Sequence, residues 1–306
     1  MSIQQQCSSM NEQIRASSRF VVIGSLLRDL LVYLDTWPSR GSQSDAYIYQ
    51  MMGGSAALLA GNLAKLGADT TLVCNLGLDA IGDTLLAELT SLGVQTVAER
   101  IGITPTVICL VEGGDRTFVS DARKVSHAVP PESLVTSTLN APCDWLHLSG
   151  YWLLGSVDVS ATLPAVRTMK NSGTYLSVDL GNSSTIPRRG AARCVEILRA
   201  LRPHVIFGNI REWQSLQVDP SVITDTAIIT NDDQPVRLRT RMETLSVAVP
   251  QILEEFDPVG AGDSLAAAYM YYFHSGINPE LALQKAISFS QHRMKDRAKC
   301  HIEQNM

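Results

Sequence analysis

Short apolar runs alternate with longer segments of helical spacing along most of this chain. The first run, Phe20–Ser25 (FVVIGS), is apolar and β-branched, as expected for a strand buried on both faces. After it, the pattern predicts strands at residues 71–75, 145–148, 175–179, 205–207 and 227–230, and helices at residues 83–91, 157–170, 191–201, 264–274 and 279–291. Because strands and helices alternate, we expect an α/β fold with a mostly parallel central sheet flanked by helices.

Two segments depart from this alternation. Residues 33–52 alternate polar and apolar positions around turn residues, and residues 106–119 have the pattern of a hairpin. Both are typical of exposed antiparallel strands, which could pair with each other. The expected division is an α/β core of residues 19–32, 53–105 and 120–306, a small β piece of residues 33–52 and 106–119, and a disordered polar tail of residues 1–18.

Composition narrows the class of protein. The 306 residues are 45% hydrophobic and 18% charged, with a net charge of −5, which argues against disorder and against a basic nucleic-acid coat. No leader and no apolar stretch of about 18 residues is found, so we expect a cytoplasmic protein with no membrane contact. The six cysteines form no CxxC pair, which favours reduced structural thiols over a zinc or redox site.

The segment Asp257–Asp263 (DPVGAGD) carries the most chemical information. Its two glycines directly precede a predicted helix, so backbone N–H groups could converge there on an anion that the helix N-terminus also attracts. The carboxylate of Asp263 would repel such an anion unless it served as a base, which favours catalysis. The alternative is a glycine-rich turn with Asp263 as a helix N-cap, and the motif alone leaves both open.

With its following serine, this segment resembles the second signature of the ribokinase-like (PfkB) carbohydrate kinases. Three further segments resemble the first signature of this family, namely Gly53-Gly54, the Ala-rich helix that ends at Gly67, and residues 75–83. Residues 24–29 are similar to the first strand and its substrate-binding aspartate. The similarity extends from about residue 20 to residue 291 and also includes Asn209–Glu212, which matches an N-x-x-E motif.

The resemblance implies a ribokinase-like fold, in which the small β piece is a lid, and an ATP-dependent sugar kinase. Asp263 would accept the proton of the attacking hydroxyl, while amides of Gly260, Ala261 and Gly262 stabilise the transferred phosphoryl group. The remaining implied site residues are Asp29, Gly53, Gly54 and Ser55 for substrate, Asn209 and Glu212 for Mg²⁺ through water, and Asn209, Glu212, Thr230 and Asp257 for nucleotide. A monovalent cation such as K⁺ near Asp257 is also implied.

Single residues keep simpler interpretations open. Asn209 and Glu212 are three residues apart, so they could be a capping pair at a helix start. His147, within the run WLHLSG, is expected to be a core or strand-end histidine.

Three departures from the family pattern concern the ligands. Leu58 stands where many sugar-binding members have asparagine, which would remove a sugar contact. In the segment 230–235 (TNDDQP), Asp232 and Pro235 replace two glycines of a loop beside the nucleotide, which predicts weaker nucleotide binding or a re-routed loop. Residues 292–306 are rich in Lys and His where an apolar, Gly-containing segment is usual, which suggests a divergent or truncated terminus. The basic residues of this segment are interspersed with Asp296, which favours a solvated tail over a nucleic-acid arm.

Two alternative functions therefore remain beside the sugar kinase. One is a nucleoside kinase of the same family, and the other is a non-catalytic ligand-binding or regulatory relative. The expected partners are a small sugar or nucleoside, with no nucleic acid. A homodimer formed through the strand edges of the lid is also expected.

Overall fold

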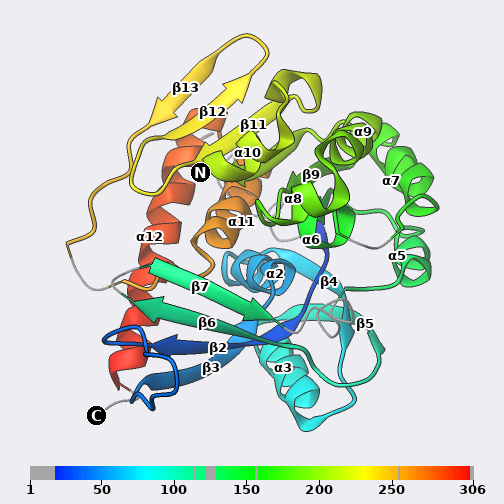
Figure 1. The fold of residues 1–306 in the computed structure, drawn as a ribbon. Helices are drawn as coiled ribbons and strands as arrows, with labels where there is room; N and C mark the ends of the chain where they lie inside the picture. Colours follow the sequence, from blue (N-terminus) through cyan, green and yellow to red (C-terminus); the bar gives the residue numbers. More distant parts are fainter. Residues whose placement is uncertain (1–17, 113–114, 121–128, 156–157, 254–255, 304–306) are drawn as a thin grey trace, which may run out of the picture.

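The computed structural model describes residues 18–112, 115–120, 129–155, 158–253 and 256–303. Two sheets form its framework (Figure 1): a nine-stranded sheet with the strand order β13-β12-β11-β10-β9-β8-β1-β4-β5, and a four-stranded sheet with the order β3-β2-β6-β7. The predicted fold class is thereby confirmed: a mostly parallel central sheet with helices and a separate small sheet. The predicted disordered tail lies, except for residue 18, outside the described residues.

The large sheet is parallel from β5 to β11 and antiparallel only at the edge formed by β12 and β13. Its strands are β1 (Arg19–Ile23), β4 (Asp69–Leu76), β5 (Val94–Arg100), β8 (Trp145–Leu148), β9 (Tyr175–Asp179), β10 (Val205–Asn209), β11 (Thr226–Thr230), β12 (Val236–Thr240) and β13 (Thr244–Val247).

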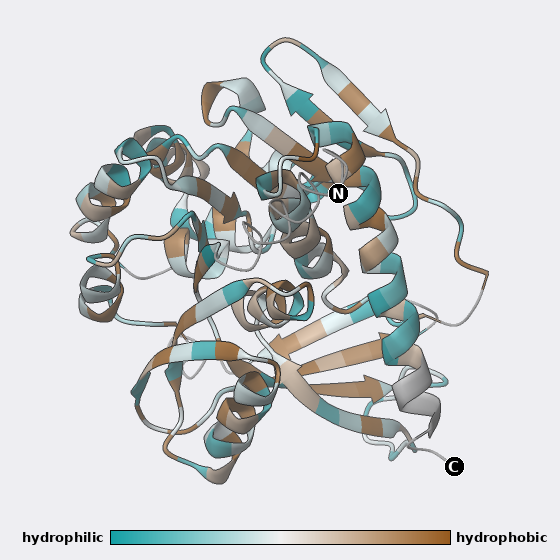
Figure 2. Ribbon diagram, turned by 180° about the vertical axis from the view of Figure 1, so that it is seen from behind, coloured by the Kyte–Doolittle hydropathy of each residue, from teal (hydrophilic) through white to brown (hydrophobic). Residues whose placement is uncertain are grey.

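Consecutive residues of β1 enter two different hydrophobic cores. Phe20 and Val22 belong to one buried cluster, and Val21 and Ile23 belong to another. Since successive strand residues point to opposite faces, both faces of the sheet are buried, as the run of apolar residues predicted. Each face is covered by its own set of helices, whose segments alternate between hydrophilic and hydrophobic residues in Figure 2.

One core receives residues from α2, α3, α11 and α12, and the other from α5 to α10. The helices are α2 (Ser55–Lys65), α3 (Ala80–Ser91), α5 (Glu132–Thr138), α6 (Gly150–Leu153), α7 (Thr162–Asn171), α8 (Thr185–Arg189), α9 (Ala191–Leu201), α10 (Ile210–Leu216), the short 3₁₀ turn η2 (Pro220–Val222), α11 (Ala261–His274) and α12 (Pro279–Glu303).

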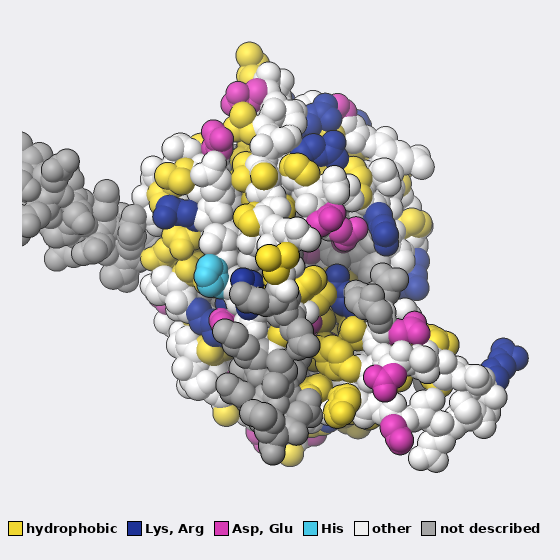
Figure 3. Space-filling model, turned by 90° about the vertical axis from the view of Figure 1, so that its left-hand side faces the viewer, with side chains coloured by type: hydrophobic (Ala, Val, Ile, Leu, Met, Phe, Trp, Pro, Cys, Tyr) yellow, Lys and Arg dark blue, Asp and Glu magenta, His cyan; other side chains and the backbone are white. Residues whose placement is uncertain are grey.

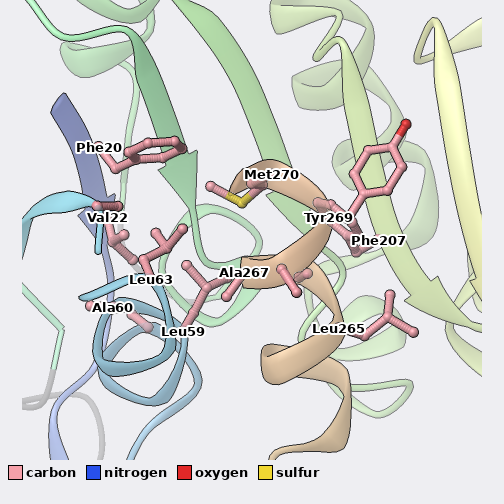
Figure 4. Close-up of a cluster of buried hydrophobic side chains, with 14 of the residues drawn as sticks. Phe20, Val22, Leu59, Ala60, Leu63, Phe207, Leu265, Ala267, Tyr269 and Met270 are labelled. Carbon is pink, nitrogen blue, oxygen red and sulfur yellow. The ribbon is translucent and has the colours of Figure 1, made fainter. Parts of the chain in front are cut away.

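The contact between α2 and α11 positions the functional site. In Figure 4, Leu59 and Leu63 of α2 face Ala267 of α11, and all three side chains are buried. Ala267 is small, which leaves room for the two leucines of α2. The first residue of α2 is thereby held beside the first turn of α11, although the two are far apart in the sequence.

The small sheet consists of β2 (Leu27–Tyr33), β3 (Tyr47–Gly53), β6 (Thr106–Glu112) and β7 (Asp115–Ser120). The structure thus extends the lid to residues 27–33, of which residues 27–32 were expected in the core. The reason is that β2 contributes to a core of the lid itself: Leu31 packs with Cys109 and Val259 in a third, smaller core. The outer strands of this sheet are β3 and β7, and the homodimer expected through them stays a prediction.

The sequence pattern also missed one strand and the last part of one helix. Strand β5 is an edge strand with only one buried residue, so no apolar run marked it. Helix α12 continues to Glu303 instead of ending at residue 291, so much of the expected solvated tail is helical. On the face shown in Figure 3, acidic and basic side chains are interspersed. Within the described ranges, no helix is long and apolar enough to cross a membrane.

Candidate active site

A cleft of about 630 Å³ lies between the lid and the carboxyl ends of the parallel strands. Its walls come from the lid strands β2, β6 and β7, from the start of α2, from the ends of β9, β10 and β11, and from the first turn of α11. Ligand sites of open α/β sheets are expected at this edge. Most of the predicted site residues line it, namely Asp29, Gly54, Ser55, Asn209, Glu212, Thr230, Gly260, Gly262 and Asp263.

Asp263 stands in the first turn of α11, and its carboxylate faces α2. The Ser55 hydroxyl donates a 2.6 Å hydrogen bond to Asp263 Oδ1. The N-cap of α11 is Gly260, with no side-chain capping bond, so the alternative of Asp263 as a helix N-cap is wrong. Burial raises the pKa of Asp263 to about 7, with the bond from Ser55 opposing this rise and the negative charge of Asp179 adding to it.

A carboxyl group with a pKa of about 7 is half deprotonated near neutral pH, which suits a general base.

The turn before α11 leaves its backbone open toward the cleft. Gly260 has a φ of 69°, a left-handed conformation that favours glycine. A Cβ built on Gly262 would meet no atom within 4 Å, so the backbone there is open to a ligand. Amides of a first helical turn have no acceptor within the helix, although the Ala261 N–H is used by the turn and donates to Pro258 O at 3.2 Å.

Asp29 forms the lid side of the cleft. It is buried on β2, and a Cβ on Gly53 of the neighbouring strand would come within 2.4 Å of its carboxylate oxygens. Gly54 has a φ of 95° and lies against Ser25 O. Gly53 therefore leaves room for the carboxylate of Asp29, and Gly54 leaves room for the backbone of Ser25. Burial raises the pKa of Asp29 to about 7, opposed by the positive charge of Arg297.

Asn209 and Glu212 form the capping pair that the sequence left open. Asn209 N donates to Glu212 Oε2 at 2.8 Å, Asn209 Nδ2 donates to Glu212 Oε1 at 2.7 Å, and Glu212 N donates to Asn209 Oδ1 at 3.0 Å. The pair also lines the cleft, so capping and ligand contact are compatible. Burial raises the pKa of Glu212 to about 7, while the bonds from Asn209 lower it.

A magnesium ion fits this arrangement only through water or ligand oxygens. In the part of the chain that the structure describes, no three His, Cys, Asp or Glu side chains group to hold a metal. Both Glu212 oxygens already accept bonds from Asn209, and the Asp179 carboxylate, which also lines the cleft, is hydrogen-bonded to His147 and Gly150 N. Mg²⁺ keeps several of its waters and binds one or two carboxylates together with phosphate oxygens, which this set of donors allows.

The segment after Thr230 is a tight turn between two strands. Thr230 lies beside Asn209 in the register of β10 and β11. Asp232 takes a φ of 48°, a conformation that aspartate tolerates better than most residues, and Gln234 N donates to Asn231 O at 2.9 Å. Asp232 is exposed and is not among the residues lining the cleft. The segment thus forms the turn of the β11–β12 hairpin, and the expected weaker nucleotide binding or re-routed loop stays a prediction.

Three of the predicted site residues, Gly53, Asp257 and Ala261, do not line the cleft. Asp257 is buried, and its Oδ1 accepts a 2.9 Å bond from Val259 N, so it shapes the turn. Ala261 donates its N–H to Pro258 O at 3.2 Å, within the turn. Asp257 and Ala261 are local supports of the motif.

His147 is a core residue, as expected. It is fully buried, hydrogen-bonded to Ser177 Oγ at 2.8 Å and to Asp179 Oδ2 at 3.1 Å. Asp179 Oδ1 also accepts a bond from Gly150 N at 3.1 Å. The histidine therefore orients a carboxylate that does line the cleft.

Sequence reasoning missed several residues of the cleft. Tyr151 follows β8 in the short helix α6, and Arg188 lies at the end of α8. Val107 and Phe118 come from the lid. The only sequence signal for Tyr151 is its place just after a parallel strand, and the other three carry no motif.

The C-terminal basic residues include one that reaches the site. The sequence favoured a solvated tail, but Arg297 of α12 is partly buried and donates from Nη1 to Val259 O, in the turn before α11. The expectation of a solvated tail is therefore wrong for this residue. Alternation of basic and acidic residues hid the fact that α12 packs along α11.

Replacing Ser55 by alanine should move the pH dependence of activity. The bond from Ser55 lowers the pKa of Asp263, so its loss should raise that pKa and shift the acidic limb of kcat/KM upward by about 1 pH unit. Ser55→Thr, which keeps a hydroxyl, is the control and should leave the limb in place. An unmoved limb in Ser55→Ala would contradict this role.

Comparisons with known proteins show the family and the fold of this chain. A family model described as pfkB family carbohydrate kinase matches residues 17–295. The chain is 28% identical over 280 residues to the ATP-dependent ribose-1-phosphate kinase of Halopiger xanaduensis, covering 88% of this chain and 89% of that protein.

Among solved structures, the adenosine kinase of Sinorhizobium meliloti superposes with a TM-score of 0.77 at 17% identity, covering 89% of this chain and 92% of that one. A structure described as a ribokinase II from E. coli, in complex with ATP and Mg²⁺, gives a TM-score of 0.73 at 20% identity, covering 90% and 92%. At these identities the superpositions establish the ribokinase-like fold.

Proposed function

Because the chain belongs to the pfkB family of carbohydrate kinases, we propose that it transfers the γ-phosphoryl group of ATP to a hydroxymethyl group of a sugar or sugar-like molecule. The observation that carries this proposal is the position of Asp263. Its carboxylate, with a pKa of about 7, stands in the first turn of α11 beside the open backbone of Gly262. Base and anion site thus share one cleft with Asp29 of the lid.

In the proposed reaction, Asp263 accepts the proton of the acceptor hydroxyl as its oxygen attacks the γ-phosphorus. The new O–P bond forms while the bond from phosphorus to the β,γ-bridging oxygen breaks, and ADP leaves. Backbone N–H groups of the turn around Gly260 and Gly262 stabilise the charge on the transferred group. Asn209 and Glu212 would hold Mg²⁺ through water, and the ion would neutralise phosphate charge.

The acceptor is held on the lid side. Asp29 supports this assignment, because a buried carboxylate on a cleft wall can accept hydrogen bonds from hydroxyl groups. A nucleoside acceptor is the second candidate, since Leu58, Val107 and Phe118 add apolar surface to the same cleft. Phe118 keeps 53% of its surface exposed and could stack on a base.

An ADP-release assay with Mg-ATP tests the proposal. The acceptor panel contains pentoses, ribose 1-phosphate, hexoses, keto-sugar acids and nucleosides. We expect turnover with one of these classes, and the class with the highest kcat/KM decides between sugar and nucleoside. Binding of ATP without transfer to any acceptor would instead support the non-catalytic relative.

A further inference from the structure

Helix α12 fixes the turn before α11 at three points. Met294 O accepts a 3.0 Å bond from Asp257 N, and Ser290 Oγ donates a 2.8 Å bond to Ala261 O. Arg297 Nη1 donates to Val259 O. The backbone of the anion-binding turn is therefore held from one side by a single helix.

The guanidinium of Arg297 lies directly against the turn. A Cβ built on Gly260 would be 2.8 Å from its Nη1 and 3.0 Å from its Nη2. The carbonyl group of Pro258, which precedes Val259 in the turn, also accepts a bond from a guanidinium: Arg116 Nη1 of the lid donates to Pro258 O at 2.9 Å. Two successive carbonyl groups of the turn thus accept bonds from positively charged side chains.

The acidic residues of the site act on the same guanidinium. Burial lowers the pKa of Arg297, and the charges of Asp257, Asp263 and Asp29 oppose this effect, with Asp257 first among them. The positive charge of Arg293 acts in the same direction as burial. Arg297 is therefore a partly buried cation stabilised by the carboxylates of the proposed active site.

These residues do not fit a bound monovalent cation. Such an ion near Asp257 would need backbone carbonyl and carboxylate oxygens of the turn. The Val259 carbonyl already accepts a bond from Arg297, and Asp257 already interacts with its charge. A second cation in this small space would be repelled by the guanidinium.

We propose that Arg297 takes the place of the monovalent cation implied near Asp257, and that it holds the turn 257–263 in its anion-binding shape without potassium. The inference rests on the proposed function, because the turn is taken to bind a transferred phosphoryl group. Arg297 acts through the turn and is thus a positioning residue. The kinase is expected to be independent of K⁺.

The first test compares the wild-type protein in potassium chloride and in choline chloride at equal ionic strength. Thermal unfolding midpoints, with and without Mg-ATP, should differ by less than about 1 °C, whereas a millimolar potassium site would raise them by about 5 °C. The turnover rates in potassium chloride and in choline chloride should agree within about twofold. The midpoints need no acceptor, so a failed acceptor assay does not affect this result. A clear rise in midpoint or turnover with potassium would overturn the proposal.

The second test removes the guanidinium of Arg297, so that an added cation can take its place. Arg297→Ala should lower kcat/KM by about 100-fold. Adding potassium chloride or methylguanidinium chloride should raise kcat/KM of this variant again by about tenfold. Either salt should also raise the unfolding midpoint of the variant above its value in choline chloride. Arg297→Lys keeps the charge and should not respond to potassium. Arg293→Met, one turn earlier on the same helix, removes an equal charge and should also show no response.

Loss of activity in Arg297→Ala without any response to these cations would leave only a structural role and overturn the proposal. If that variant does not fold, the wild-type comparison alone decides.

Discussion

Replacing Asp263 by asparagine should lower kcat by about 10³- to 10⁴-fold with little change in nucleotide binding. Asparagine has nearly the same shape and can still accept the hydrogen bond from Ser55, but it cannot accept a proton from the acceptor hydroxyl. The measurement is steady-state ADP release with the best acceptor of the panel, beside ATP binding by calorimetry. Activity within about tenfold of the wild type would remove Asp263 as the base.

The stability of the same variant provides an independent check. Because the folded-state pKa of Asp263 is raised to about 7 from an ordinary value of 3.8, the folded protein binds more protons than the unfolded chain between these pH values. The contribution of this carboxyl group to stability is therefore present at low pH and is lost as pH rises through about 7. Asp263→Asn should gain in unfolding midpoint relative to the wild type at pH 8, and less at pH 5.

The matched control is Asp83→Asn, which also changes an aspartate that follows a glycine in the first turn of a helix. Asp83 is exposed on α3 and pairs with Arg100. Its replacement should leave kcat and the pH dependence of the relative midpoint near those of the wild type. An equal loss of activity in both variants would point to a general effect of charge.

Much of the fold could be predicted because the sheet is buried on both faces. Phe20 to Ile23 of β1 are all apolar and nearly inaccessible, and in β8, which is fully buried, only His147 interrupts the apolar run. Strands without this property were missed or misplaced. β5 has polar residues on an open edge, and β2 contributes to a different core, since Leu31 packs inside the lid.

The local parts of the site could also be predicted, because each lies within one short motif. The GAGD turn, the Asn209–Glu212 pair and the Gly53-Gly54 turn all lie at or next to the cleft. Contacts between segments could not be predicted. Ser55 and Asp263 are 208 residues apart and meet only because α2 packs on α11. Arg297 was indistinguishable in sequence from the neighbouring basic residues of α12.

The two glycines of the GAGD turn should respond differently to alanine. Gly260→Ala should lower both stability and turnover, because its φ of 69° is left-handed and the new methyl group would lie 2.8 Å from Arg297 and 3.0 Å from Leu58. The backbone conformation alone costs about 1–2 kcal/mol. Gly262→Ala has free space within 4 Å, so its unfolding midpoint should equal or exceed that of the wild type.

Turnover of Gly262→Ala should nevertheless fall by about 10- to 100-fold, since the methyl group would project where the phosphoryl group approaches the backbone. Gly93→Ala serves as the control: Gly93 is also left-handed, with a φ of 83°, and has no atom within 4 Å of the added Cβ. It should lose stability and keep its turnover. Full activity in Gly262→Ala would place the transferred phosphoryl group elsewhere, because an anion bound by these amides cannot share their position with a methyl group.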